Sequence, residues 1–302
     1  MTTPDALRTQ LSGVIAFPVT PFHDDLSLNL AGLRHNLQAL KNAPICAVVA
    51  AAGTGEFHTL SPDELKQVIE VTVAEIGGRV PVLAAAGINT ALGVEQAKQA
   101  QAAGVDGLLL FPAYYPTADD DALLAYYKTL ADATPLGVLI YSRDSFNPSP
   151  ALVQRLADSI PNLIALKDGQ GDTRRLQQIM HKVGERLHWI GGAGDDAVPG
   201  YYSIGIRTYT SSIANLSPQI SRQLHDTAAT GDQDALAELM QRYVLPLYTF
   251  RARRKGYEVS VMKRLMDKIG LVGGPVRPPL ADLRESEYAE LELLATLWRS
   301  ER

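Results

Sequence analysis

Lys167 follows a short apolar run, residues 162–166, that has the composition of a buried strand. Burial disfavours the charged ammonium and lowers the pKa of a lysine from its ordinary value of about 10.4. The neutral amine that results is a nucleophile, and it forms a Schiff base with a ketone or an aldehyde. Residues 168–172 form a loop in which a pocket can open. Lys167 is therefore a candidate for covalent catalysis.

Tyrosines end or follow two other apolar runs. Tyr141 ends the run 137–141, whereas Tyr114 and Tyr115 follow the run 107–111. Taken singly, each is better explained as a packing aromatic with a hydrogen-bonded hydroxyl. A Schiff-base lysine nevertheless needs a proton shuttle, because forming and collapsing the carbinolamine moves several protons. Tyr141 is the candidate for that shuttle.

A glycine-rich loop, Gly53-Thr54-Gly55, follows the apolar run 47–51. Glycines expose backbone N–H groups, and beside the Thr54 hydroxyl they can bind a carboxylate. Alone, the loop is equally consistent with a tight turn. Arg143, two residues after Tyr141, is a candidate donor for a second anionic group, although it can also simply pair with Asp144.

Other polar segments carry weaker signals. The loop Gly192-Ala193-Gly194 lacks the strand–helix unit of a dinucleotide site, so no cofactor is predicted, and Asp195 and Asp196 are interpreted as caps of the next helix. Ser211 ends the run 208–211. No histidine or cysteine has a partner at metal-ligand spacing, so no metal is predicted. The basic run 251–255 is interpreted as a solvated helix face or an interface.

Eight short apolar runs alternate with segments of helical character, which is typical of buried parallel strands joined by helices. The runs are Val14–Phe17, Ala47–Ala51, Val82–Ala85, Gly107–Phe111, Gly137–Tyr141, Leu163–Leu166, Trp189–Gly191 and Thr208–Ser211. The pattern predicts an α/β fold, a (β/α)₈ TIM barrel, and the count and even spacing favour it over a doubly wound open sheet. A barrel would bring all the candidate residues to one face.

After the last strand the pattern is helical, with helices expected at 217–229, 232–248, 259–269 and 285–299. We expect residues 1–216 to supply the strands and most helices of the barrel. Residues 217–302 would supply its last helix and a C-terminal helical extension packed on the barrel.

The composition excludes several classes of protein. The chain has 302 residues, a formal net charge of −5 and one cysteine, Cys46. Nucleic acid is therefore not an expected partner, and an internal disulfide is excluded. No apolar run approaches the ~20 residues of a membrane span, and the N-terminus lacks the features of a secretion signal. We expect a cytoplasmic protein that does not bind a membrane.

The chain resembles the lysine aldolase and dehydratase family typified by dihydrodipicolinate synthase and N-acetylneuraminate lyase, from the segment 13–22 to the helical C-terminus. The resemblance implies that Lys167 forms the imine, that Tyr141 is catalytic, and that residues 53–56 bind a carboxylate. It also implies a family loop at Gly194 and a tyrosine, Tyr115, that crosses a subunit interface. A homotetramer built as a dimer of dimers is expected on the same ground.

Within that family, the chain departs from the synthase pattern. Gly53 replaces the first of two threonines, and Phe146 stands where the synthases have an arginine that helps bind a semialdehyde. The segments 50–57, 141–144 and 166–172 instead resemble the 5-dehydro-4-deoxyglucarate dehydratases, although Ser142 replaces their usual asparagine.

This second resemblance implies a small-molecule substrate, a keto-deoxy sugar diacid. The product would be 2,5-dioxopentanoate, formed with loss of water and CO₂ in the catabolism of glucarate or galactarate. Thr54 and Tyr115 would assist Tyr141, and Arg143 and Ser211 are candidates for the substrate hydroxyls or the distal carboxylate. One alternative is an aldolase that releases pyruvate from a 2-keto-3-deoxy sugar acid. Another is a catalytically idle barrel that binds keto acids.

Overall fold

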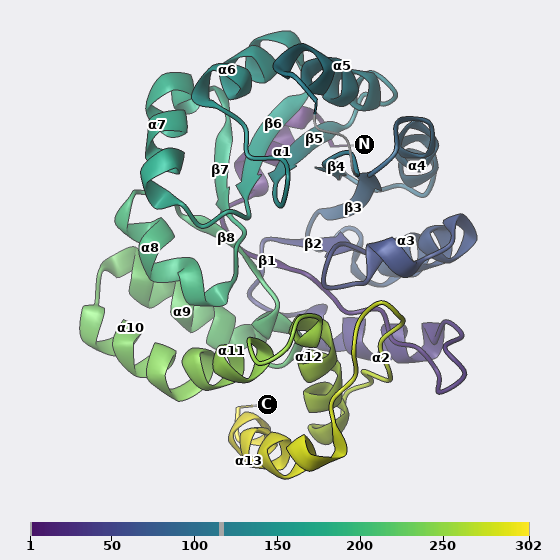
Figure 1. Ribbon diagram of the computed structural model, residues 1–302, viewed down its shortest axis with the longest axis vertical. Coiled ribbons are helices and arrows are strands. Elements are labelled where there is room, and N and C mark those ends of the chain that lie inside the picture. The colour runs from purple at the N-terminus through teal and green to yellow at the C-terminus, as the bar shows by residue number, and fades with distance from the viewer. Residues whose placement is uncertain (1, 115–117, 302) are drawn as a thin grey trace.

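A computed structural model describes residues 2–114 and 118–301. Eight parallel strands form a closed barrel in the order β1 to β8, surrounded by helices (Figure 1). The strands are β1 (Gly13–Ala16), β2 (Ala47–Ala50), β3 (Val82–Gly87), β4 (Gly107–Phe111), β5 (Gly137–Ser142), β6 (Leu163–Asp168), β7 (His188–Gly191) and β8 (Thr208–Ser211). The predicted TIM barrel is confirmed. The first and last residues of each predicted strand lie within two residues of those observed.

Helices connect the strands and cover the outside of the barrel (Figure 1). They are α2 (Leu30–Leu40), α3 (Pro62–Ile76), α4 (Thr90–Ala102), α5 (Asp120–Ala131), α6 (Pro150–Ser159), α7 (Thr173–Val183), α8 (Val198–Ser203) and α9 (Pro218–Thr230). All residues of β1, β2, β3, β5, β6 and β8 are buried. Burial on both faces explains why most of these strands are apolar runs without alternation. In β8 (Thr208–Ser211), the buried residues are mostly polar, and hydroxyls of this strand form hydrogen bonds.

The start of α3 illustrates how the sequence specifies a helix end. Ser61 accepts a hydrogen bond from the N–H of Glu64, and the Glu64 side chain accepts one from the N–H of Ser61. This capping box satisfies two N–H groups that the helix leaves free, and Pro62 occupies a position that needs no N–H. The cap fixes where the chain turns after the loop that follows β2.

A helix that the sequence analysis missed, α1 (Pro4–Gln10), contacts β5 and β6 before the chain enters the barrel (Figure 1). Its Leu7 is fully buried, and a Cβ added at Gly107 would lie only 2.5 Å from that leucine, whereas one at Gly137 would lie 3.3 Å from it. Thr3 caps the helix, and Pro4 begins it. Both residues are helix-start signals. Since Gly107 and Gly137 begin their strands, α1 closes the amino-terminal end of the barrel.

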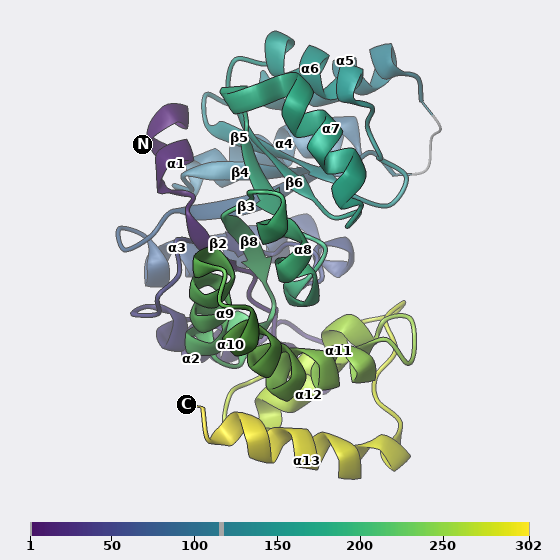
Figure 2. The same cartoon turned by 90° about the vertical axis from the view of Figure 1, so that its left-hand side faces the viewer.

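Beyond α9 the chain forms α10 (Gln233–Leu239), a π-helical turn (Met240–Val244), α11 (Leu245–Arg251), α12 (Tyr257–Lys268) and α13 (Tyr288–Arg299). The helix predicted at 232–248 is therefore interrupted. Pro246 has no N–H and its ring crowds the carbonyl one turn earlier, which a wider turn relieves. Figure 2 shows α11, α12 and α13 gathered at one end of the molecule, with α13 outermost.

The boundary proposed between residues 216 and 217 stays a prediction. Within the described parts of the chain, no helix combines the length and the apolar character needed to cross a membrane.

Candidate active site

Lys167 lies inside the barrel near the C-terminal end of β6 and is 3% exposed. Its Nζ donates a hydrogen bond to the carbonyl oxygen of Gly192 (3.1 Å). No carboxylate of the described residues lies within 4 Å of it. Burial is the main cause that lowers the Lys167 pKa well below its ordinary value, and the charge of Arg143 lowers it further. This environment therefore favours the neutral amine of Lys167 over the charged ammonium, as expected from the sequence.

The site is built closely around this lysine. A Cβ at Gly192 would lie 2.5 Å from Cγ and 2.8 Å from Nζ of Lys167. Gly192 is also tied to β6, because its N–H donates to the carbonyl of Asp168. The Tyr201 hydroxyl donates to the Asp168 carboxylate (2.8 Å). These contacts explain why a glycine follows β7 directly, and they fix the lysine's surroundings.

Tyr141 is the neighbour of Lys167 on the adjacent strand β5. The Lys167 Nζ lies 3.3 Å from the centroid of the Tyr141 ring, so it contacts the ring face rather than the hydroxyl. That hydroxyl accepts a hydrogen bond from Nη1 of Arg143 (2.9 Å). Burial raises the pKa of Tyr141, and the Arg143 guanidinium opposes the rise. The phenol is thus protonated at neutral pH and hydrogen-bonded to a permanent cation, which suits a proton donor and acceptor.

The loop that follows β2 has unpaired polar groups, and two of its residues, Gly53 and Thr54, line the cavity. Among the described residues, no acceptor pairs with the N–H groups of Gly53, Thr54 or Gly55, or with the Thr54 hydroxyl. A Cβ at Gly53 would meet nothing within 4 Å, whereas one at Gly55 would lie 3.0 Å from Cα of Ala51. Gly55 therefore permits the tight turn and Gly53 leaves open space. Adjacent free N–H groups of this kind bind anions.

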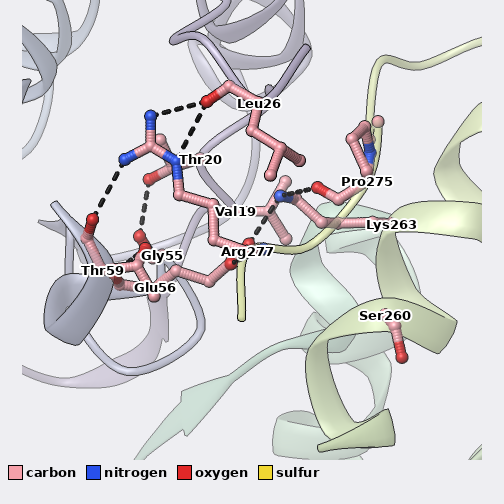
Figure 3. A network of polar contacts seen from close by, with 12 residues as sticks. Val19, Thr20, Leu26, Gly55, Glu56, Thr59, Ser260, Lys263, Pro275 and Arg277 are labelled. Atoms are coloured by element: carbon pink, nitrogen blue, oxygen red, sulfur yellow. Dashed lines mark hydrogen bonds and ion pairs between the residues drawn. The ribbon is translucent and has the colours of Figure 1, made fainter. Parts of the chain in front are cut away.

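A buried ion pair between Glu56 and Lys263 holds this loop in place, and Figure 3 shows the residues around it. Glu56, in the left-handed region (φ 56°), is fully buried. Its carboxylate accepts from Nζ of Lys263 on α12 (2.5 Å) and from the N–H of Arg277 (2.9 Å). The same Nζ donates to the carbonyl of Pro275 (2.7 Å). The C-terminal segment thereby fixes a loop that lies about two hundred residues earlier.

One cavity of about 850 Å³ brings most of the predicted residues together. Its walls include Gly53, Thr54, Tyr141, Arg143, Lys167, Gly194 and Ser211. Gly55 is buried behind the loop and is not in the wall. Tyr115 lies outside the described residues. Tyr114, its neighbour, lines the cavity and is 76% exposed.

Ser211 has a fully buried side chain whose hydroxyl is already engaged. It donates to the carboxylate of Asp195 and pairs with the Ser221 hydroxyl (2.8 Å). Asp195 also accepts from the Tyr248 hydroxyl (2.8 Å) and the N–H of Ser212 (3.1 Å). The interpretation of Asp195 as a helix cap is wrong, because it joins β8 to α11 instead. We therefore expect Ser211 to position the residues of this hydrogen-bond network and not to bind the substrate through its own hydroxyl.

Arg251 was missed because it belongs to a run of basic residues. The sequence predicts residues 251–255 as a solvated helix face or an interface. Residues 252–255 are exposed as expected, but they lie in the turn that follows α11 and not on a helix. The interpretation is wrong for Arg251, which is 9% exposed and lines the cavity. No sequence signal separates Arg251 from its neighbours, since the difference depends on how α11 packs.

Among the described residues, no three His, Cys, Asp or Glu side chains are placed to hold a metal ion.

Comparison with known proteins agrees with this geometry. The sequence profile of the Dihydrodipicolinate synthetase family matches residues 10–297. The chain belongs to this family. The probable 5-dehydro-4-deoxyglucarate dehydratase of Bradyrhizobium diazoefficiens is 40% identical over 97% of this chain and 94% of its own. Its namesake in Methylobacterium radiotolerans is 39% identical over 97% of both chains.

Solved structures of family members share the fold. Dihydrodipicolinate synthase from Oceanobacillus iheyensis superposes with a TM-score of 0.91, at 25% identity over 98% of this chain and 99% of that one. The Escherichia coli K12 prophage protein YagE, solved in complex with pyruvate, gives 0.86 at 27% identity over 95% and 98%. Family membership and the dehydratase-named relatives identify the chain as a lyase of the Schiff-base type.

The departure of Phe146 from the synthase pattern and that of Ser142 from the dehydratase pattern both have structural counterparts. Phe146 is 3% exposed and packs against the ring of Tyr127, with centroids 4.8 Å apart. The Ser142 hydroxyl donates to the carbonyl of Phe146 (3.2 Å) and is not part of the cavity wall. Neither side chain supplies a charge to the cavity.

Proposed function

We propose that the protein converts 5-dehydro-4-deoxyglucarate to 2,5-dioxopentanoate with loss of water and CO₂. The observation that carries the proposal is the buried Lys167 amine, which lies against Tyr141 in a cavity that Gly53 and Thr54, with their unpaired N–H groups, also line. The dehydratase names of relatives that match nearly the whole chain support the choice of substrate.

The reaction begins at the keto acid. Thr54 and the adjacent N–H groups hold the carboxylate beside the ketone. Lys167 then attacks the ketone carbon through its lone pair, and Tyr141 gives a proton to the oxygen that leaves as water. The product is a protonated imine, which makes the neighbouring CH₂ acidic. No metal or cofactor takes part in this step as proposed.

Loss of a CH₂ proton gives an enamine, which expels the β-hydroxyl as water after protonation. The remaining conjugated iminium then accepts the electron pair of the C–C bond that joins the distal carboxylate, and CO₂ leaves. The resulting dienamine carries an enol, which becomes the aldehyde, and hydrolysis of the imine frees Lys167. The diacid C₆H₈O₇ thus yields H₂O, CO₂ and C₅H₆O₄.

Product analysis tests this proposal directly. Incubation of the purified protein with 5-dehydro-4-deoxyglucarate should release one CO₂ for each 2,5-dioxopentanoate formed. Borohydride added during turnover should reduce the imine and add the corresponding mass to Lys167. Release of pyruvate would establish the aldolase alternative, and binding with neither turnover nor adduct would establish the keto-acid-binding barrel.

Tyr141→Phe is expected to lower kcat by roughly 10²- to 10⁴-fold, the usual contribution of a positioned proton shuttle. The ring that contacts the Lys167 amine remains, so the protein should stay folded. Steady-state kinetics and circular dichroism provide the measurement. Tyr126→Phe is the control, because that hydroxyl donates to the carbonyl of Phe111 (3.0 Å) and does not line the cavity. Equal losses in the two variants would contradict the role of Tyr141.

The quaternary structure and location are separate proposals. A homotetramer and a role for Tyr115 across its interface rest on the family resemblance, and light scattering with a Tyr115→Phe variant tests them. The cytoplasmic location stays a prediction.

A further inference from the structure

Arg251 is the most deeply buried arginine of the described residues, at 9% exposure, and it stands at the end of α11 in the wall of the cavity. A buried guanidinium is costly unless an anion or several acceptors compensate it. Its surroundings therefore bear directly on what the cavity binds.

The contacts of Arg251 leave most of its donors unused. Nη1 donates to the Ser212 hydroxyl (2.9 Å), and the guanidinium carbon lies 4.4 Å from the centroid of the Tyr248 ring. Its buried Nε has no partner, and within the described residues no carboxylate oxygen lies within 4 Å of its nitrogens. The Asp195 carboxylate nearby is occupied by Ser211, Ser212 and Tyr248.

Other arginines near the C-terminus are compensated. Arg253 forms a two-pronged pair with Glu290, Arg264 contacts Asp282, and Arg277 contacts Glu64. In the cavity itself, Arg143 already donates to Tyr141 and lies 3.5 Å from the carboxylate of Asp144. Arg251 thus differs from each of them in being buried without a carboxylate in direct contact. Asp195 reaches it only through the Ser212 hydroxyl, and Asp196 acts on it only at longer range.

We propose that Arg251, supported by Ser212, binds the distal carboxylate of the substrate. This inference rests on the function proposed above, because only a diacid presents a second carboxylate. It replaces Arg143 as the main candidate for that contact.

The barrel topology places the two anion sites apart. In the closed order of strands, β2 lies opposite β6, whereas β8 lies two strands from β6. Thr54 follows β2, Lys167 lies on β6, and Ser212 follows β8. A keto acid joined to Lys167 can therefore direct its first carboxylate toward Thr54 and its far end toward Arg251. A keto-deoxy sugar acid that ends in a hydroxymethyl group would leave the guanidinium uncompensated.

The test compares Arg251→Met with Arg251→Gln and the control Arg253→Met. Arg251→Met should raise KM for the diacid by roughly 10- to 100-fold, the range expected for a lost charge-assisted hydrogen bond, with a smaller change in kcat. Arg251→Gln should show a similar rise. Borohydride trapping with pyruvate, which has no distal carboxylate, should be unchanged in both. Arg253→Met should match the wild type, since Arg253 is exposed and lies outside the cavity.

The outcomes are separable. Failure of the wild type to release CO₂ from the diacid would overturn the proposed function, and this inference with it. A turning-over wild type with an unchanged KM in both Arg251 variants would overturn only the inference. Loss of pyruvate trapping in both variants would also overturn it, because the effect would then not depend on the distal carboxylate.

Discussion

Lys167→Met is expected to abolish borohydride trapping and to lower kcat/KM by at least about 10⁴-fold, because a covalent step without its nucleophile has no substitute. Among the described residues, the other buried lysine is Lys263, which is paired with Glu56 and lies outside the cavity wall. Mass analysis of the trapped protein and steady-state kinetics provide the measurement. An adduct formed on a different lysine would contradict the assignment of Lys167.

Lys167→Met should lower the free energy of unfolding by no more than about 1 kcal/mol, the contribution of the lost hydrogen bond to Gly192. Because the variant no longer buries an ionisable amine, its free energy of unfolding can equal or exceed that of the wild type. The pKa of Lys167 is lower in the folded protein than in the unfolded chain, so between the two values the unfolded chain binds more protons. The free energy of unfolding of the wild type therefore rises with pH in that range. Lys167→Met should remove this slope, which urea titrations at several pH values can measure.

The pH dependence of imine formation follows from the same shift. A lysine with an ordinary pKa of about 10.4 would gain close to ten-fold in neutral amine for each pH unit between 7 and 10. Because burial lowers the pKa of Lys167 well below its ordinary value, the rate of trapping by pyruvate and borohydride should rise far less over this range. A ten-fold rise per unit would show that the amine is charged at neutral pH.

Lys263→Met is expected to destabilise the protein by about 3–5 kcal/mol, because it leaves the Glu56 carboxylate buried with an unpaired charge. Burial lowers the pKa of Lys263 to about 8 although Glu56 opposes the shift. Burying the pair therefore costs free energy, but leaving one of the two charges buried without its partner costs more. Thermal or urea unfolding provides the measurement.

The matched control is the double variant Glu56→Gln with Lys263→Met. It removes both charges and keeps an acceptor for the N–H of Arg277, so it should recover part of the stability lost in the single variant. Since Glu56 adjoins the loop with Thr54, Lys263→Met should also raise KM. A single variant as stable as the wild type would contradict the role of the pair.

The sequence alone determined the barrel and the central chemistry. Strands buried on both faces are mostly apolar, so all eight could be predicted from the sequence alone. Parallel strands in a closed barrel end on one face, which predicted that Tyr141, Lys167 and Thr54 would meet there. These conclusions depend on local composition and on a topology that follows from it.

Tertiary structure decided what surrounds that centre. The position of Arg251 depends on how the end of α11 packs beside Ser212, the residue that follows β8, and four neighbours in the same basic run are exposed. Glu56 and Lys263 are separated by about two hundred residues, so their pairing leaves no local pattern. Ser211 was predicted at the right place, but only its contacts with Asp195 and Ser221 show that its hydroxyl is already used. Contacts between distant segments depend on how helices and strands pack together, and the spacing of residues along the chain does not specify that packing.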